Sequence, residues 1–514
     1  MTEFGPQIAA AYNTKGPAIE LGLGVLDGEV VPEAAVRIPL SMMNRHGLIA
    51  GATGTGKTKT LQVLAEQLSA HGVPVLIADI KGDVSGMAHP GEAEGKGADR
   101  AKDLGIPFEP VSFPVDFFSL GAIGPGVPIR AALSDFGPQL LAKILGANET
   151  QEQSLQLVFH YADSKNLPLL DLSDLRSLLT FLDSDDGKAE LEGIGGLSGQ
   201  TVGVLLRSMV GLEQGGGTEF FGEPQLDTND LMRVGPDGRG VVSCLELPAV
   251  QDKPELWSTA LMWLVAELFE SLPEAGDLEK PKLVVFLDEA HLLFDGATDA
   301  FLKSIEQTVR LIRSKGIGVF FVTQTPKDVP GDVLAQLGNR VQHALRAFTP
   351  DDAKALKATV STFPKSEFYD LGTLLTSLGI GEAAVTILSD RGIPTPVVHT
   401  RLRPPASRMA PADDVAGAAA ASPLAAKYTV RLERESAREL LEARIAAARA
   451  VEETAPPPAQ APAPAPKPRV PPQRREPAPG PGTGEVVGDF VRSRQGKAIM
   501  REVVRGVFGL LKKR

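Results

Sequence analysis

Glycine, lysine and threonine recur between Gly47 and Thr60 with a spacing that suits phosphate groups. Residues 51–58 read GATGTGKT and fit the pattern G-x-x-x-x-G-K-[ST]. The glycines let backbone N–H groups curl around phosphates, and the N-terminus of the following helix adds a favourable dipole. The segment lies between an apolar strand pattern and an amphipathic helix pattern, which is the context this loop requires. The sequence therefore predicts a nucleotide-binding loop.

The parts of this loop are expected to have different roles. The Lys57 ammonium is expected to reach the β- and γ-phosphates, and the Thr58 hydroxyl to hold Mg²⁺. A Gly-rich turn without a ligand is the alternative interpretation of the same residues. The predicted phosphate-binding residues are Gly51, Ala52, Thr53, Gly54, Thr55, Gly56, Lys57, Thr58 and Thr60.

An acidic pair follows a second apolar run, in the segment KLVVFLDEAH. The apolar residues predict a buried strand that ends at Asp288 and Glu289. Asp288 is expected to contact Mg²⁺ through water, and Glu289 to orient and polarise an attacking water. A carboxylate directly after the metal-binding aspartate indicates hydrolysis as well as binding. The alternative is a strand end capped by acids, and we interpret His291 as structural.

Two further strand ends carry polar residues. The segment GVFFVTQTP predicts a buried strand beside the one that carries Asp288, and Gln324 at its end is a candidate sensor of the γ-phosphate. The alternative is a polar strand terminus. Asp79 ends the strand in LIADIKGD and could support Mg²⁺ or the water indirectly. Asp83 is a weaker candidate of the same kind, and a turn role fits it equally well.

Arginines in VRLIRSKG and GNRVQHALR are candidates for a catalytic cation. If the protein forms a ring, an arginine of the neighbouring copy would stabilise the charge of the transition state. Arg313 is the first candidate, followed by Arg310 and Arg340. The alternative for each is a surface ion pair or a cation at a helix end.

The elements that must position these residues alternate between strands and helices. Residues 46–90 predict strand, glycine-rich loop, helix and strand, and apolar runs typical of buried strands return near residue 240. A helix is expected over 298–315, and Thr349 is expected to cap a helix that begins at Pro350. Residues 18–40 predict a small β element with a turn at Asp27-Gly28.

The pattern divides the chain into six parts. The fold class is α/β, with a small N-terminal β element and a core interrupted by a mainly helical insertion. A charged helix is expected over 424–453 and a further helix after a Pro/Ala-rich linker. The predicted bounds are 1–45 for the β element, 46–90 and 235–400 for the core, 91–234 for the insertion, 401–454 for the helical extension, 455–483 for the disordered linker and 484–514 for a basic amphipathic segment.

Bulk composition narrows the class of protein. A chain of 514 residues is too long for one hydrophobic core, and its single cysteine, Cys244, excludes a disulfide framework. The N-terminus lacks a signal-peptide pattern, and the longest apolar run is too short to span a bilayer and contains Glu267. We therefore expect a cytoplasmic protein. A net charge of −12 argues against wholesale coating of nucleic acid but allows a local basic channel.

The C-terminal residues differ in character from the rest. Residues 455–483 are rich in Pro and Ala and are expected to be extended, reaching ~90 Å at ~3.1 Å per residue. Residues 484–514 contain eight Lys or Arg residues and three acidic ones, a local charge of +5 in an acidic protein. Such a segment could dock on the acidic body of the chain, contact DNA, lie on a membrane or bind another protein.

The amino-acid sequences of four segments resemble the main motifs of HerA-like helicases. These helicases belong to the HerA/FtsK branch of additional-strand P-loop ATPases. The segments are HGLIAGATGTGKT, VVFLDEAHLLF, VRLIRSKGIGVFFVTQTP and LGNRVQHALR. Three more are similar to the YjgR-type branch of this family: GVPIRAALSDFGPQLLAKILGANETQ, RAFTPDDAKAL and RESARELLEAR. The resemblance covers about residues 15–450.

The resemblance implies a RecA-like core, ATP with Mg²⁺, and a homo-hexameric ring that threads double-stranded DNA. Arg313 corresponds to a finger that acts on the neighbouring copy, and His46 matches a family histidine that either contacts adenine or packs. The leading expectation is an ATP-driven DNA translocase or helicase. A nucleotide-controlled module that acts on a protein partner and a membrane-surface ATPase are the alternatives. The other residues that correspond to family positions are Lys57, Thr58, Asp288, Glu289 and Gln324.

Overall fold

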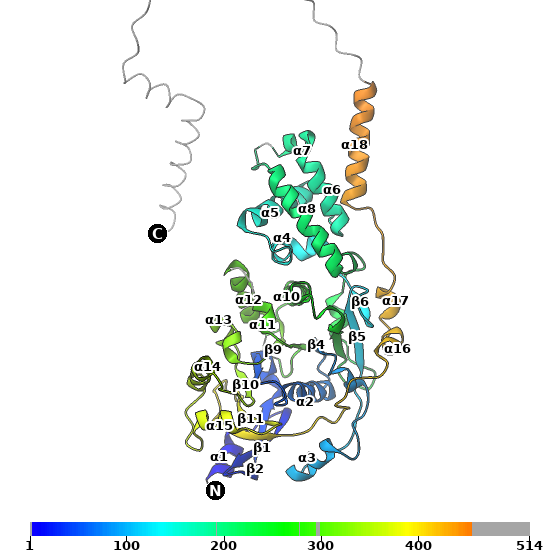
Figure 1. Cartoon of the computed structure of the whole chain (residues 1–514). Coiled ribbons are helices and arrows are strands. Elements are labelled where there is room, and N and C mark those ends of the chain that lie inside the picture. Colours follow the sequence, from blue (N-terminus) through cyan, green and yellow to red (C-terminus); the bar gives the residue numbers. More distant parts are fainter. Residues whose placement is uncertain (1–2, 192, 277, 295–298, 455–514) are drawn as a thin grey trace, which may run out of the picture. The chain divides into compact units, whose positions relative to one another are not determined.

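One twelve-stranded sheet organises the chain (Figure 1). The computed structural model describes residues 3–191, 193–276, 278–294 and 299–454. Eight neighbouring strands of the sheet are parallel: β10 (Asn339–Gln342), β3 (Gly47–Ala50), β9 (Ile317–Thr323), β8 (Leu283–Leu287), β4 (Val75–Asp79), β7 (Val242–Glu246), β5 (Val115–Leu120) and β6 (Val127–Ile129). Four antiparallel strands extend the sheet beyond β10: β11 (Glu382–Thr386), β12 (Val398–Leu402), β1 (Ala18–Leu26) and β2 (Glu29–Pro39).

The central strands are buried on both faces, as their continuous apolar runs predict. Successive residues along each of these strands pack into two different hydrophobic cores. Val285 and Leu287 of β8 pack in the core that contains Trp257 of helix α10 (Pro254–Ser271). Phe286, between them, packs in the second core with Leu64 of helix α2 (Lys57–Ala70). This alternation follows from the two-residue period of a strand and fixes which side chains reach each helix layer.

Strand β9 lies between β3 and β8 and is parallel to both. The strand that precedes the glycine-rich loop and the strand that precedes the acidic pair are therefore separated by one extra strand. This order is that of a RecA-like core of the additional-strand class, and it confirms the predicted fold class. All these strands run the same way, so the residues that follow them gather at one edge of the sheet.

The N-terminal β element is a hairpin continuous with the main sheet. Its turn lies at Asp27-Gly28, with φ values of +51° and +85°, as predicted. Strand β1 pairs with β12 and so joins the antiparallel side of the sheet. Helix α1 (Phe4–Ala11) precedes the hairpin and contributes Phe4 and Ile8 to the second core.

Residues 91–234 are largely helical but also supply β5 and β6 to the sheet. Helices α5 and α6 begin with capping boxes, at Asn148 and Asp171. The helices of this region are α3 (Lys96–Leu104), α4 (Leu133–Ile144), α5 (Glu149–Ser164), α6 (Leu172–Asp183), α7 (Asp185–Glu190), α8 (Gly199–Leu212) and α9 (Thr218–Phe220). Most of their buried apolar residues belong to the same core as α10.

The second half of the core confirms two helix predictions. Helix α12 (Asp299–Ile312) continues into the 3₁₀ turn η6 (Arg313–Lys315), and Thr349 caps helix α14 (Pro350–Ser361) through a capping box. The remaining helices here are α11 (His291–Phe294), α13 (Gly331–Leu334) and α15 (Leu371–Ser377). Helix α10 is a buried helix, as its composition predicts. No helix among the described residues is both long and apolar enough to cross a membrane.

The prediction of one continuous helix over 424–453 is wrong. Helix α16 (Val415–Ala420) and helix α17 (Ala425–Tyr428) precede a non-helical stretch, and helix α18 (Ala437–Thr454) begins after it. In that stretch the Leu432 N–H donates to the Glu223 carbonyl, and Arg434 pairs with the Glu223 carboxylate. These contacts with a distant segment replace helical hydrogen bonds. The predicted linker at 455–483 and basic segment at 484–514 lie outside the described residues.

Candidate active site

The glycine-rich loop leaves β3 at Ala50 and enters α2 at Lys57. Gly51, Gly54 and Gly56 have φ values of +154°, +77° and +116°, a region that disfavours side chains. A Cβ atom on Gly51 would lie 2.5 Å from the Cβ atom of His343. The loop therefore needs glycine for its backbone shape and for its close approach to the strand extension behind it.

His343 supports the loop from behind. Its Nε2 lies 2.9 Å from the Thr60 hydroxyl, and burial lowers the pKa of its ring to about 4. Thr60 also donates to the Gly56 carbonyl, so the structure places this predicted phosphate-binding hydroxyl against His343. Sequence reasoning missed His343, because only the sheet brings β10 beside β3.

Lys57 is buried and folds back over its own loop. Its Nζ donates to the carbonyls of Gly51 at 2.7 Å and Ala52 at 3.3 Å. Burial lowers the pKa of Lys57, and the charge of Glu289 opposes that effect. The lysine head and the acidic pair are thus close enough to interact electrostatically, as a phosphate site between them requires.

The acidic pair follows β8 directly. Asp288 is buried, and desolvation together with the charge of Glu289 raises its pKa to about 7. Glu289 has a φ of +46°, an unusual value for a residue with a side chain, and its N–H donates to Asp288 Oδ1 at 2.9 Å. Strain of this kind is found where a side chain must be held in one direction.

Lys81 contacts the predicted water-orienting carboxylate. Its Nζ lies 2.6 Å from Glu289 Oε1, while His291 Nδ1 lies 3.4 Å from the other carboxylate oxygen. Burial acts to lower the pKa of Lys81, but the hydrogen bond to Glu289 and the charge of Asp288 outweigh it and raise the pKa. Sequence reasoning missed Lys81, and the one signal that could have found it is its place two residues after the predicted strand end at Asp79.

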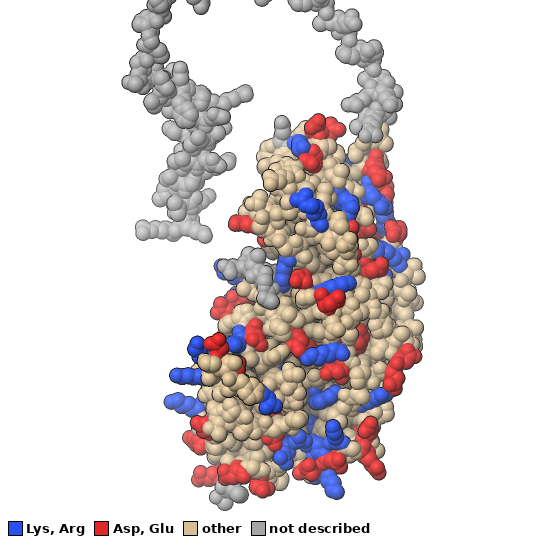
Figure 2. Space-filling model, viewed as in Figure 1, with Lys and Arg blue, Asp and Glu red and all other residues tan. Residues whose placement is uncertain are grey.

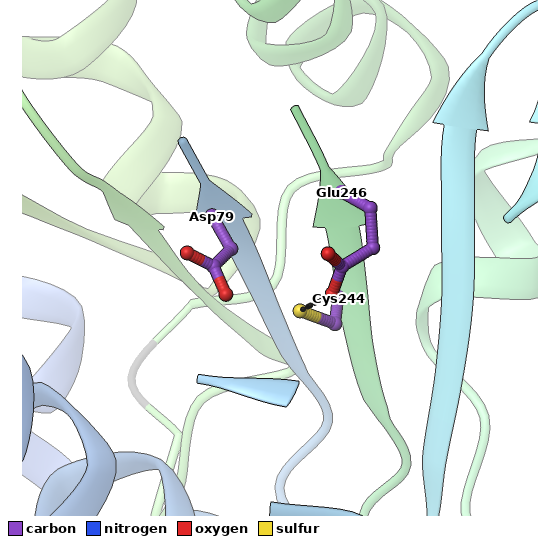
Figure 3. A group of neighbouring side chains, drawn as sticks. All are labelled: Asp79, Cys244 and Glu246. Atoms are coloured by element: carbon purple, nitrogen blue, oxygen red, sulfur yellow. Dashed lines mark hydrogen bonds between the residues drawn. The ribbon is translucent and has the colours of Figure 1, made fainter. Parts of the chain in front are cut away.

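A buried cluster holds the loop that carries Lys81. Figure 3 shows Asp79 on β4 and Cys244 and Glu246 on β7, with their side chains turned toward one another. The Asp79 carboxylate accepts four hydrogen bonds, at 2.8–3.3 Å, from the backbone N–H groups of residues 81–84. Asp79 therefore fixes the start of the loop that carries Lys81.

The same cluster has three potential metal ligands within 4.8 Å of one another. Its donor atoms are already engaged in hydrogen bonds within the protein, however, which does not favour a cation. Burial raises the pKa of the Cys244 thiol well above its usual value, and burial with the charge of Asp79 raises that of Glu246 to about 7. The thiol donates to Glu246 Oε1, and the Asp79 oxygens are already occupied. The hydrogen bonds of the cluster thus hold the loop that carries Lys81.

Glu246 gives a stability prediction. Its folded-state pKa of about 7 lies above its ordinary value of 4.5, so the protein loses stability as pH rises between these values. The Glu246→Gln variant lacks this loss of stability, because glutamine does not ionise. It is expected to be more stable than the parent at pH 8, on the order of 2 kcal/mol, and equal to it near pH 4.5. Thermal unfolding at both pH values measures this, and a difference independent of pH would contradict it.

Two residues fit the predicted Mg²⁺ site. Thr58, at the start of α2, offers a hydroxyl oxygen, and Asp288 offers a carboxylate oxygen, which are donors that Mg²⁺ prefers. The buried Asp288 carboxylate also lies beside a second negative charge, an arrangement that a divalent cation would stabilise. The donor groups of Thr58 and Asp288 therefore suit Mg²⁺.

Gln324 lies directly after β9 and is exposed at the edge between the loop strand and the strand of the acidic pair. The turn after it is rigid, because Asp328 accepts from the hydroxyls of Thr323 and Thr325 at 2.9 and 2.8 Å. The sheet thus brings the carboxyl ends of β3, β9 and β8 to one edge.

The three candidate arginines lie at the opposite edge of the sheet. Arg313 precedes β9, Arg340 lies near the start of β10, and both line one cavity with Arg310 and His46. Strand β3 has four residues, so at ~3.3 Å per residue the two edges are ~13 Å apart. The structure does not bring these arginines to the loop of the same copy.

A cavity of about 630 Å³ adjoins the glycine-rich loop. Gly56 and Lys59 form one wall, and Ile380 and Pro404 form part of the other. The loop around Ile380 is tied to the site, because the N–H of Gly381 donates to the Thr55 carbonyl at 3.0 Å. Sequence reasoning missed this cavity, since its walls lie more than three hundred positions apart.

Two relatives have low sequence identity to this chain. The DNA double-strand break repair helicase HerA of Sulfurisphaera tokodaii is 24% identical over 367 residues, which cover 69% of this chain and 64% of that protein. HerA of Sulfolobus acidocaldarius is 23% identical over 365 residues, covering 68% and 64%. The chain thus spans less than two thirds of the length of these relatives.

A solved structure shares the fold. The plasmid coupling protein TrwB in complex with ADP and Mg²⁺ superposes with a TM-score of 0.50 at 16% identity, over 80% of this chain and 94% of that one. The family described as helicase HerA-like C-terminal matches residues 26–514. With the glycine-rich loop, the acidic pair and the extra strand between them, the chain belongs to this HerA-like P-loop ATPase family.

Proposed function

We propose that this protein hydrolyses ATP and that six copies form a ring that translocates double-stranded DNA. One observation carries the enzymatic part: the sheet gathers the loop, the acidic pair and Gln324 at the carboxyl ends of β3, β8 and β9. We infer a cytoplasmic location from the composition and the single cysteine.

The residues of the site suit hydrolysis of a nucleoside triphosphate. Lys57 would leave the carbonyls of its own loop and bind the β- and γ-phosphates. Bound Mg²⁺, held by Thr58 and Asp288, would neutralise phosphate charge. Glu289 orients the attacking water, and Gln324 responds to the γ-phosphate. The 630 Å³ cavity beside Gly56 is where we place the adenosine.

Lys81 is inferred to restrain Glu289 before hydrolysis. Lys81 Nζ lies 2.6 Å from Glu289 Oε1. The attacking water would have to compete with this ammonium for the same carboxylate oxygen. Lys81→Met is therefore expected to raise the DNA-independent rate of hydrolysis about 2–5-fold. This factor corresponds to the free energy of a half-exposed ion pair. Lys81→Arg keeps the pair and serves as control. A lower basal rate in Lys81→Met would instead make Lys81 a contributor to catalysis.

Arg313 is proposed to act on the nucleotide of the neighbouring copy. It lies at the amino edge of the parallel strands, whereas the loop lies at the carboxyl edge of the same sheet. An arginine so placed can complete a site only across a subunit boundary. The ring is therefore part of the proposed mechanism.

DNA is proposed as the substrate because two HerA relatives are named as DNA double-strand break repair helicases. Figure 2 shows that Lys and Arg side chains alternate with Asp and Glu side chains on one face of the molecule. A ring would bring Lys and Arg side chains of several copies to one duplex, where each can neutralise a phosphate.

Displacement of streptavidin from a biotinylated duplex tests translocation. The full chain with ATP and Mg²⁺ is expected to displace it, and Glu289→Gln is not. The rate of streptavidin displacement should fall as the salt concentration increases, because contacts with the DNA phosphates are screened. If the parent hydrolyses ATP and leaves streptavidin in place on every duplex tested, it is not a DNA translocase.

A further inference from the structure

The segment that follows β12 runs past helix α2 before it reaches helix α16 (Figure 1). We call residues 403–412 of this segment the strap. Four strap residues line the cavity of about 630 Å³ beside the glycine-rich loop: Arg403, Pro404, Pro405 and Met409. The shape of one wall of that cavity therefore depends on where the strap lies.

The carboxylate of Glu66, on α2, is an anchor for the strap. Glu66 is only 4% exposed, and both of its oxygens accept hydrogen bonds from the strap. Oε2 accepts the N–H of Ala406 at 2.8 Å, and Oε1 accepts both the N–H of Ser407, at 2.9 Å, and the Ser407 hydroxyl. Burial raises the pKa of Glu66, and these hydrogen bonds oppose that effect. Because a buried carboxylate is costly without donors, Glu66 favours the strap in this position.

Two more side chains of α2 hold the strap. Lys59, Gln62 and Glu66 are spaced by three and four residues, so they lie on one face of the helix. Gln62 Nε2 donates to the Ser407 hydroxyl oxygen at 2.6 Å, and Lys59 Nζ donates to the Met409 carbonyl at 2.6 Å. The helix that begins at the glycine-rich loop thus binds the strap at three points.

The other side of the strap contacts residues 85–111. The Ala406 carbonyl accepts the N–H groups of Gly91 and Val111, both at 3.0 Å. The backbones also approach closely, because a Cβ atom on Gly86 would lie 2.0 Å from the Ala410 carbonyl oxygen. The strap is therefore held from two sides, and its place at the cavity is fixed.

We propose that Glu66 is a positioning residue for the nucleotide, which holds the strap as the wall against which the nucleoside binds. This inference rests on the proposed function, which places the adenosine in that cavity. Glu66 follows Lys57 by nine positions, so it lies ~13 Å further along the helix at ~1.5 Å per residue. Glu66 therefore acts on the nucleoside through the strap and leaves the phosphate contacts unchanged.

Two ligands that both carry phosphates test this role. Adenylyl imidodiphosphate, an ATP analogue that resists hydrolysis, has the nucleoside, and inorganic tripolyphosphate lacks it. Calorimetry on the full chain with Mg²⁺ is expected to show that Glu66→Gln binds the analogue about 10-fold more weakly, because an amide N–H₂ group then faces an N–H donor of the strap. The affinity for tripolyphosphate should stay within about 2-fold of the parent. Glu29→Gln, at an exposed carboxylate, is the matched control and should change neither affinity.

Ser407→Ala is the second variant, because it removes a donor to Glu66 from the strap and leaves α2 intact. It is expected to weaken the analogue about 3-fold and to raise KM for ATP with kcat unchanged, as the loss of uniform binding requires. Equal losses for both ligands, or no loss for either, would overturn the role of Glu66 alone. A parent that binds neither ligand would contradict the proposed function and this inference with it.

Discussion

Replacing Glu289 with glutamine is expected to lower ATP hydrolysis about 10²–10⁴-fold, the usual contribution of a positioned general base. Glutamine has the same shape and keeps an oxygen for Lys81, so the loop and the strained backbone at residue 289 need not move. ATP binding should therefore stay within a few fold of the parent. The measurements are steady-state phosphate release and calorimetric ATP affinity.

A matched control separates this effect from a loss of surface charge. Glu29→Gln removes a carboxylate from an exposed position at the start of β2 and is expected to hydrolyse ATP at the parental rate. If Glu289→Gln retains more than a tenth of the parental rate, another group orients the water, and Asp288 would be the next residue to test.

Replacing Arg313 with alanine is expected to lower hydrolysis about 10³–10⁵-fold, the range known for arginine fingers. Arg313 lies at the amino edge of the sheet, so the loss should arise at the neighbouring copy's nucleotide. Mixing Arg313→Ala with Lys57→Ala copies should restore part of the rate, because some boundaries then pair an intact loop with an intact arginine. Arg207→Ala is the control.

The absence of restoration at any mixing ratio, with hexamers present, would move the finger to another residue. Arg310 and Arg340 line the same cavity, and Arg340 is held by three carbonyls. Arg310→Ala would then be the next variant in the same mixing experiment.

The local sequence predicts the parts of the site that depend on consecutive residues. The glycine-rich loop, the strand before Asp288 and the cap at Thr349 each follow from short patterns, and the structure contains all three elements. The order of strands could be predicted only through resemblance, because nothing in the segment around Gln324 states which strands will lie beside it.

Contacts between distant segments could not be predicted. Lys81 reaches Glu289 across 208 positions, and Thr60 reaches His343 across 283. The break between α17 and α18 has the same origin, because Arg431 and Arg434 follow a helical pattern but bind Asp171 and Glu223. In each case the tertiary partner overrides local preference, and no window of sequence contains both members.

Steady-state ATP hydrolysis with and without double-stranded DNA, at low salt, tests the central claim most directly. The parent is expected to hydrolyse ATP faster on double-stranded DNA, with the stimulation rising with duplex length and absent in Glu289→Gln. A rate that stays the same with no DNA, with single strands and with duplexes of every length would contradict the assignment of this ATPase as a DNA motor.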